Sequence, residues 1–280
     1  MRLFNLHTHT RFCDGSDEPE AYVKAAIDIN FSTLGFSGHA PMPFENKYAI
    51  PTEKLTEYMV EIDLLKKKYR NQINMLKALE FDYIPGVTED FEILKKKYQL
   101  NYSIGSVHLV GNQNTEKFWF TDGGSAIPYD EGLKENYQGN IQLAVKAYYN
   151  QINQMILTQK PDIIGHLDKV KMHNQNRFFT EDEVWYQQEI DQTLDIIKSA
   201  GCIIEVNTRG LYKKRSDSLF PGTEVLKKIK SLQIPIIVST DAHSPNELSL
   251  FIPETIDLLR ELGFKGLMNY TNEWAEVELS

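Results

Sequence analysis

The chain has 280 residues, of which 41% are hydrophobic and 25% charged, as is ordinary for a globular protein with a large core. A formal net charge of −9 argues against an extended nucleic-acid interface, which needs a basic face. Two cysteines and the lack of both a signal peptide and a long apolar run predict a reduced, cytoplasmic protein with no membrane partner.

Short apolar segments alternate with longer amphipathic ones along the chain. This alternation predicts a parallel α/β sheet with helical crossovers, and seven such units favour a closed or nearly closed barrel. Strands are expected at residues 3–6, 33–37, 74–81, 102–106, 162–165, 202–206 and 235–239, and helices at 19–30, 52–69, 88–98, from 137 to about 159, 181–200, 222–232 and 253–262, before a short tail.

No linker or low-complexity run divides the chain, so we expect one domain over residues 1–280. A polar and aromatic connection at about residues 109–137 is too long for a simple connector and is expected to lie over the site. Lysine runs at 66–68, 95–97 and 227–228 end predicted helices, where cations complement the helix dipole. They therefore indicate solvated faces rather than a nucleic-acid site.

Six of the seven histidines fall at or near the ends of predicted strands. Residues two apart on a strand share a face, so His7 and His9 converge on one point, as do Asp241 and His243. Any one candidate alone has a structural explanation, such as an ordinary Asp-Gly turn for Asp14, but the repeated placement favours metal binding. The predicted metal ligands are His7, His9, Asp14, His39, Glu80, His108, His166, Asp241 and His243.

Nine imidazole and carboxylate ligands exceed what one ion needs, so we expect two or three divalent ions, whether zinc, manganese or iron. A dication lowers the pKa of bound water from about 15.7 to roughly 7, and a carboxylate such as Glu80 can bridge two ions. The residues therefore predict hydrolysis of a phosphate ester by a metal-bridging hydroxide.

The histidine and carboxylate pattern resembles the polymerase-and-histidinol-phosphatase (PHP) superfamily over nearly the whole chain. Residues 7–15 (HTHTRFCDG), 79–86 (LEFDYIPG) and 165–170 (GHLDKV) are similar to its monofunctional histidinol-phosphatase branch. The resemblance implies a distorted (β/α)7 barrel with three metal ions. It also implies hydrolysis of L-histidinol phosphate to L-histidinol and phosphate, a step of histidine biosynthesis.

The resemblance further implies how the ligands divide among the ions. One ion is held by His7, His9, Glu80 and Asp241, a second by Glu80, His108 and His166, and a third by Asp14, His39 and His243. Many members of the superfamily have a histidine where Asp14 aligns, so this chain departs from the pattern there.

The substrate-binding candidates follow the strands or lie in the insertion. Arg209 offers a planar guanidinium for a phosphate, with a solvated loop arginine as the alternative that the resemblance disfavours. Asn207 is expected to point into the mouth, and Lys169 to add positive charge. Trp119 and Asp122 offer a ring and a carboxylate for an imidazole and an ammonium group, with packing of the insertion as the alternative.

The catalytic candidates are Asp241 or His243, as the proton donor to the leaving alkoxide, and Arg209, which neutralises developing charge. The small phosphorylated substrate is the expected partner; the oligomeric state, the metal and the role of His173 are left open. One alternative is a PHP-type phosphoesterase acting on a nucleotide, a nucleic-acid end or a phosphotyrosine peptide. Another is a non-catalytic metal-binding barrel, which the complete ligand set disfavours.

Overall fold

The computed structural model describes residues 2–279, and its main sheet consists of parallel strands. The strands lie in chain order within this sheet, as expected when each is joined to the next by a right-handed crossover. They are β1 (Phe4–Asn5), β2 (Thr33–Phe36), β3 (Asn74–Asp82), β4 (Tyr102–Ser106), β7 (Ile163–Ile164), β8 (Ile203–Asn207) and β9 (Ile236–Ser239).

The two ends of this sheet meet and form a nearly closed barrel. Thr8, just after β1, forms a parallel bridge with Ala242, just after β9. The amide of His9 donates to the carbonyl of Ala242 at 2.8 Å, and the amide of Ala242 donates to the carbonyl of His7 at 3.1 Å. The segments that follow the strands therefore surround one opening, and the predicted barrel is confirmed.

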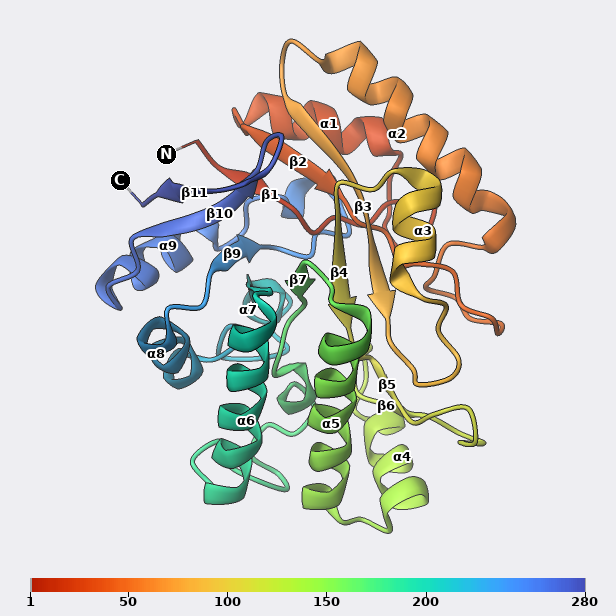
Figure 1. Cartoon of the computed structure of the whole chain (residues 1–280), viewed down its shortest axis with the longest axis vertical. Coiled ribbons are helices and arrows are strands. Elements are labelled where there is room, and N and C mark those ends of the chain that lie inside the picture. Colours follow the sequence, from red (N-terminus) through yellow and green to blue (C-terminus); the bar gives the residue numbers. More distant parts are fainter. Residues whose placement is uncertain (1, 280) are drawn as a thin grey trace.

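Helices cover the outside of the barrel, and α5 and α6 pack side by side (Figure 1). The segment predicted to be helical from residue 88 begins only at residue 91, because Asp90 accepts a hydrogen bond from the amide of Glu92 (2.8 Å) and caps the helix. The helices are α1 (Pro19–Asp28), α2 (Leu55–Tyr69), α3 (Phe91–Tyr98), α5 (Ile141–Gln159), α6 (Val184–Ala200), α7 (Arg209–Tyr212), α8 (Thr223–Leu232) and α9 (Ile252–Glu261), with 3-10 turns η1 (Thr52–Lys54), η2 (Lys169–Lys171) and η3 (Pro245–Glu247).

The insertion after β4 has more regular structure than the expected connection. It contains a hairpin of β5 (Leu109–Val110) and β6 (Trp119–Phe120), followed by α4 (Ile127–Tyr137). Gly132 weakens the helical pattern of α4 in the sequence. The structure explains this glycine, because a Cβ at this position would lie 2.7 Å from Cδ1 of Trp119. Close packing of α4 on β6 therefore outweighs helix propensity.

The C-terminal segment forms an antiparallel hairpin of β10 (Gly266–Tyr270) and β11 (Trp274–Glu278), where only a short tail was expected. Trp274 meets the ring of Tyr102 at 5.9 Å, and Asn269 donates to the hydroxyl of Thr33 at 3.3 Å. Tyr102 and Thr33 are the first residues of β4 and β2, so the hairpin lies at the amino end of the barrel. Within residues 2–279, no helix has the length and apolar character needed to cross a membrane.

Candidate active site

The first group of predicted ligands surrounds Glu80 at the end of β3. One carboxylate oxygen of Glu80, Oε2, lies 3.2 Å from Nε2 of His7 and 3.4 Å from Nε2 of His9. Asp241 Oδ1 lies 3.2 Å from Nε2 of His9 and 3.8 Å from Nε2 of His7. Donors around a tetrahedral ion with bonds of about 2.0–2.1 Å are about 3.3 Å apart, so these spacings suit one ion.

The other oxygen of Glu80 faces a second group. Oε1 lies 3.1 Å from Nε2 of His166 and 3.6 Å from Nε2 of His108, and these two nitrogens are 3.1 Å apart. Ser106 donates its hydroxyl hydrogen to the same oxygen at 2.6 Å, which fixes the orientation of the carboxylate. The two oxygens of Glu80 therefore face different ligand groups, as the bridging role requires.

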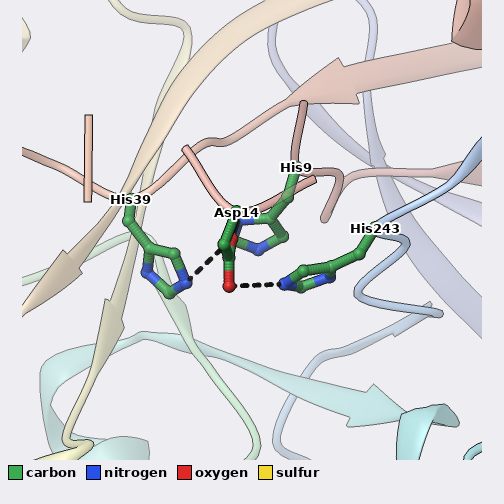
Figure 2. A group of neighbouring side chains, drawn as sticks. All are labelled: His9, Asp14, His39 and His243. Carbon is green, nitrogen blue, oxygen red and sulfur yellow. Dashed lines mark hydrogen bonds and ion pairs between the residues drawn. The ribbon is translucent and has the colours of Figure 1, made fainter. Parts of the chain in front are cut away.

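The third group surrounds Asp14, which lies between His39 and His243 (Figure 2). Asp14 Oδ2 is 3.2 Å from Nε2 of His243, and Oδ1 is 3.8 Å from Nε2 of His39. His9 also joins this group, because its Nδ1 lies 3.6 Å from Asp14 Oδ1 and its ring stacks on His243 at 4.2 Å. The resemblance assigned His9 only to the first group, whereas the structure places it between the two.

The protonation states of His9 and Glu80 suit divalent ions. Burial, followed by the nearby His243 and His39, lowers the pKa of His9 to about 3, so its imidazole is neutral. Burial alone would raise the pKa of Glu80, but the imidazoles of His7, His39 and His108 hold it well below its usual range. Neutral imidazole and ionised carboxylate are the forms that bind metal. Burial would lower the pKa of His7 and of His108, but nearby carboxylates, chiefly Glu205 and Asp82 respectively, raise both pKa values, so these two imidazoles must lose a proton to bind metal.

Whether these side chains fit metal ions can be tested on their ring nitrogens that lack a hydrogen-bond partner. Nε2 of His7, Nε2 of His9 and Nδ1 of His39 are buried and have no hydrogen-bond partner among residues 2–279. Buried polar atoms are nearly always paired. Each of these nitrogens lies 3.1–3.4 Å from the same oxygen of Glu80 without hydrogen-bond geometry, so the donor set fits divalent metal ions.

Two further carboxylates, to which the sequence analysis gave no role, hold ligand histidines in place. Glu205 Oε1 lies 2.5 Å from Nδ1 of His7, and Oε2 accepts the amide hydrogen of His166 at 2.7 Å. Asp82 Oδ2 lies 3.3 Å from Nδ1 of His108, and Oδ1 accepts the amide hydrogen of that residue at 2.9 Å. The hydrogen bond between Glu205 and Nδ1 of His7 fixes the tautomer of His7 and turns its Nε2 towards the ion, and the bond from the amide of His108 to Asp82 fixes the backbone at His108. For Glu205, the sequence did contain one signal that could have revealed this role: it is a charged residue within the otherwise apolar first part of strand β8.

A cavity of about 240 Å³ opens beside the metal ligands. Two of its cations are already paired, since Lys169 Nζ lies 2.8 Å from Asp122 Oδ2 and Arg209 donates from Nη1 to the carbonyl of Asp241 at 2.7 Å. The guanidinium of Arg215 has no hydrogen-bond or ion-pair partner in the described part of the chain, and it was not predicted. Besides metal ligands, the lining comprises Tyr48, Phe120, Asp122, Gly123, Gly124, Lys169, Arg209 and Arg215.

Two predicted substrate residues do not reach this cavity. Asn207 is buried, donates to Glu205 at 3.2 Å and accepts the amide hydrogen of Arg209 at 2.8 Å, so it positions Arg209 instead. Trp119 is fully buried and donates from Nε1 to the carbonyl of Tyr129 at 3.0 Å. Successive residues of a strand face opposite ways, so the neighbouring Phe120 lines the cavity and the prediction for Trp119 is corrected.

Asp241 does not suit the role of proton donor. Burial would raise its pKa, but His7 and Arg209 hold the pKa well below its usual range, so the carboxyl group is ionised. Its position beside His7 and His9 instead suits a metal ligand. His243 is no better placed to donate a proton, because its Nε2 faces Asp14 in the third ligand group (3.2 Å) and its Nδ1 lies 2.9 Å from the carbonyl oxygen of Asp241.

Comparison with known proteins identifies the family. Residues 5–209 match the model of the PHP domain. Over 266 residues the chain is 27% identical to the histidinol-phosphatase of Bacillus subtilis, with 89% of this chain and 96% of that protein covered.

Two solved structures have the same fold. A candidate histidinol phosphatase from Listeria monocytogenes superposes with a TM-score of 0.78 at 25% identity, over 90% of this chain and 99% of that one. Histidinol phosphate phosphatase from Lactococcus lactis, complexed with zinc, L-histidinol and phosphate, gives a TM-score of 0.71 at 20% identity, over 97% and 98% of the two chains. The family model covers well over half of the sequence, and the resemblance is confirmed: the chain belongs to the PHP domain family.

Proposed function

We propose that this protein is a metal-dependent phosphomonoesterase that hydrolyses L-histidinol phosphate to L-histidinol and phosphate. The observation that carries the proposal is the placement of Glu80, whose two oxygens face two separate groups of imidazoles beside a cavity lined by cations. The name of the Bacillus subtilis relative and the ligands of the Lactococcus lactis protein support the choice of substrate. A place in histidine biosynthesis and a cytoplasmic location stay predictions.

The nine predicted ligands are proposed to hold the ions in the three groups described above, with His9 shared between two of them. When bound, divalent ions supply Lewis acidity towards phosphoryl oxygens and lower the pKa of coordinated water. Glu205 keeps Nε2 of His7 turned towards the centre, and Asp82 accepts the amide hydrogen of His108 and so holds its backbone beside the centre. The protein thus contributes a set of metal-donor atoms that needs little rearrangement when the ions bind.

The phosphate is proposed to bind where Lys169, Arg209 and Arg215 line the cavity. Arg209 is held by the carbonyl of Asp241 (2.7 Å) and the hydroxyl of Tyr212 (3.1 Å), both through Nη1, and its Nε faces the Asp241 carboxylate at 3.9 Å, so its Nη2 group is available to a phosphoryl oxygen. Arg215 is unpaired among the described residues and can turn fully towards an anion. Positive charge from three side chains would stabilise the charge that develops on the phosphoryl oxygens.

The leaving group is proposed to lie against Phe120 and Tyr48, which line the cavity. Tyr48 donates to Asp82 at 3.1 Å, which fixes its ring beside the ring of His39 at 5.1 Å. A cavity of about 240 Å³ suits one small organic phosphate, so it favours histidinol phosphate over a phosphotyrosine peptide. Other small phosphoesters are the alternative substrates.

The test is to load the purified protein separately with manganese and zinc and to measure kcat/KM for three substrates: L-histidinol phosphate, p-nitrophenyl phosphate and a nucleoside monophosphate. We expect a preference of about a hundredfold for L-histidinol phosphate, or about 2.7 kcal/mol in the transition state. Comparable weak rates on all three would assign the site to another substrate. Bound metal without any hydrolysis would instead indicate a non-catalytic barrel.

A further inference from the structure

The ion pair between Lys169 and Asp122 joins two elements that are distant in the sequence. Lys169 lies in η2, which follows β7, whereas Asp122 follows β6 in the insertion. Their charged atoms are 2.8 Å apart, and the side chains are 5% and 21% exposed, respectively. The pair therefore occupies the cavity wall at the point where the insertion meets the barrel.

Both members of the pair also face the metal ligands. Lys169 Nζ lies 3.8 Å from Asp241 Oδ2, and Asp122 Oδ2 lies 3.8 Å from Nε2 of His108. A phosphoryl group that enters beside these ligands comes within reach of Lys169, whose side chain is buried in the cavity wall. Since Lys169 is already paired with Asp122, an incoming anion competes with the Asp122 carboxylate for it.

We propose an exchange of ion pairs in which the substrate separates Lys169 from Asp122: its phosphoryl group binds Lys169, and its ammonium group binds Asp122. The inference rests on the proposed function and deepens it by naming the feature that selects the substrate. In L-histidinol phosphate the ammonium and the ester oxygen are carried by adjacent carbons, so both charges fall within reach of neighbouring side chains. The selected class is a phosphate monoester with an ammonium group next to the ester carbon.

The exchange discriminates because charges in this wall are largely removed from water. A monoester without an ammonium group would take Lys169 and leave the Asp122 carboxylate without its cation, which is costly for a buried charge. A zwitterionic substrate replaces one ion pair with two and leaves no charge unpaired. Asp122 thus acts as a specificity-determining residue that binds the substrate directly.

The test compares Asp122→Asn with Asp130→Asn. Asparagine keeps the acceptor for the amide of Gly123, which Asp122 Oδ1 accepts at 2.6 Å, but removes the charge. Asp130 is a matched control because it also lies in the insertion and also pairs with a cation, Arg177 (2.7 Å), but does not line the cavity. Binding of inorganic phosphate and of L-histidinol to the metal-loaded proteins is measured by calorimetry, together with the metal content.

We expect Asp122→Asn to bind inorganic phosphate about tenfold more tightly, because Lys169 is released, and L-histidinol about tenfold more weakly, because its ammonium loses its partner. Asp130→Asn should change neither. A purely structural role of Asp122 would shift both affinities in the same direction, and that result, or unchanged affinities, would overturn the exchange. Loss of a metal ion from Asp122→Asn would overturn it as well, since Asp122 would then be a ligand.

Hydrolysis separates this inference from the proposed function. If the wild-type protein fails to hydrolyse L-histidinol phosphate but Asp122→Asn shifts the two affinities in opposite directions, the exchange stands and the substrate assignment fails. If the wild-type protein does hydrolyse it, the ratio of its kcat/KM to that of the analogue lacking the amino group should fall about tenfold in Asp122→Asn. An unchanged ratio would overturn the exchange alone.

Discussion

Glu205 in β8 lies 2.5 Å from Nδ1 of His7, which is 198 residues away in the sequence, and accepts the amide hydrogen of His166 through its other oxygen at 2.7 Å. One buried carboxylate therefore supports ligands from two groups. Ser239 and Asn207 also donate to Glu205, so its orientation is fixed from several sides. The metal-binding geometry thus depends on a residue that is not itself among the predicted ligands.

Glu205→Gln should weaken metal binding by about 10–100-fold, because the amide group cannot accept hydrogen bonds at both ends. With one end turned to His166 or His7 as a donor, a buried N–H group would face another N–H group. The measurement is the metal-to-protein ratio after equilibration against a graded series of a competing chelator.

The control for this variant is Glu189→Gln in α6. Glu189 is also a buried carboxylate, but its partner is Lys146 at 3.7 Å, and it does not line the cavity beside the metal ligands. Its metal affinity should equal that of the wild-type protein. Equal affinity in Glu205→Gln would mean that Glu205 does not support the ligands.

Glu80→Gln should lower kcat by more than about a hundredfold and reduce the metal content. The amide has only one oxygen, so it cannot serve both His7 (3.2 Å from Oε2) and His166 (3.1 Å from Oε1) through a shared pair of ions. Activity is measured at saturating metal and substrate, and metal content by elemental analysis of the same sample. Near-normal turnover would show that Glu80 does not bridge two ions.

The sequence predicted which side chains gather at the opening of the barrel, because these residues obey a local rule. His7 and His9, like Asp241 and His243, are two residues apart at a strand end, and the topology of a parallel barrel brings all strand ends to one opening. Glu205 does not follow such a rule. A carboxylate inside a strand has the same local pattern whether it orients a ligand or pairs with a lysine, and only the fold shows its contact with His7.

The insertion shows a different reason why the sequence alone does not predict every contact. Trp119 and Phe120 are adjacent in a strand, so one ring faces the cavity and the other packs against the insertion. Strand β6 has only two residues, so no alternating pattern distinguishes them in the sequence. The contact between Trp119 and the carbonyl of Tyr129 depends on α4, whose pattern Gly132 obscures. Aromatic composition indicated a covered site, but not which ring covers it.

Removal of the metal ions should destabilise the folded protein. Without metal ions, the carboxylates of Glu80, Asp241 and Asp14 lie together in a mostly buried cluster. An ion present at about a thousandfold above its Kd contributes about 4 kcal/mol per site, so a chelator should lower Tm by roughly 10 °C or more. Differential scanning calorimetry with and without chelator measures this shift, and readdition of manganese or zinc should restore Tm. A chelator-independent Tm would contradict a metal centre within the barrel.

Trp119→Phe and Phe120→Leu should separate stability from substrate binding, although the two residues are neighbours. Trp119 is fully buried, so its replacement removes packing volume and the hydrogen bond to Tyr129, which should cost about 1–3 kcal/mol of unfolding free energy and leave KM unchanged. Phe120 is half-buried and lines the cavity, so Phe120→Leu should raise KM for L-histidinol phosphate by about threefold to tenfold and have little effect on Tm. Chemical denaturation and steady-state kinetics on both variants measure the two effects. If Trp119→Phe raised KM as much as Phe120→Leu, the substrate would contact the other face of β6, and the correction made for Trp119 would itself be wrong.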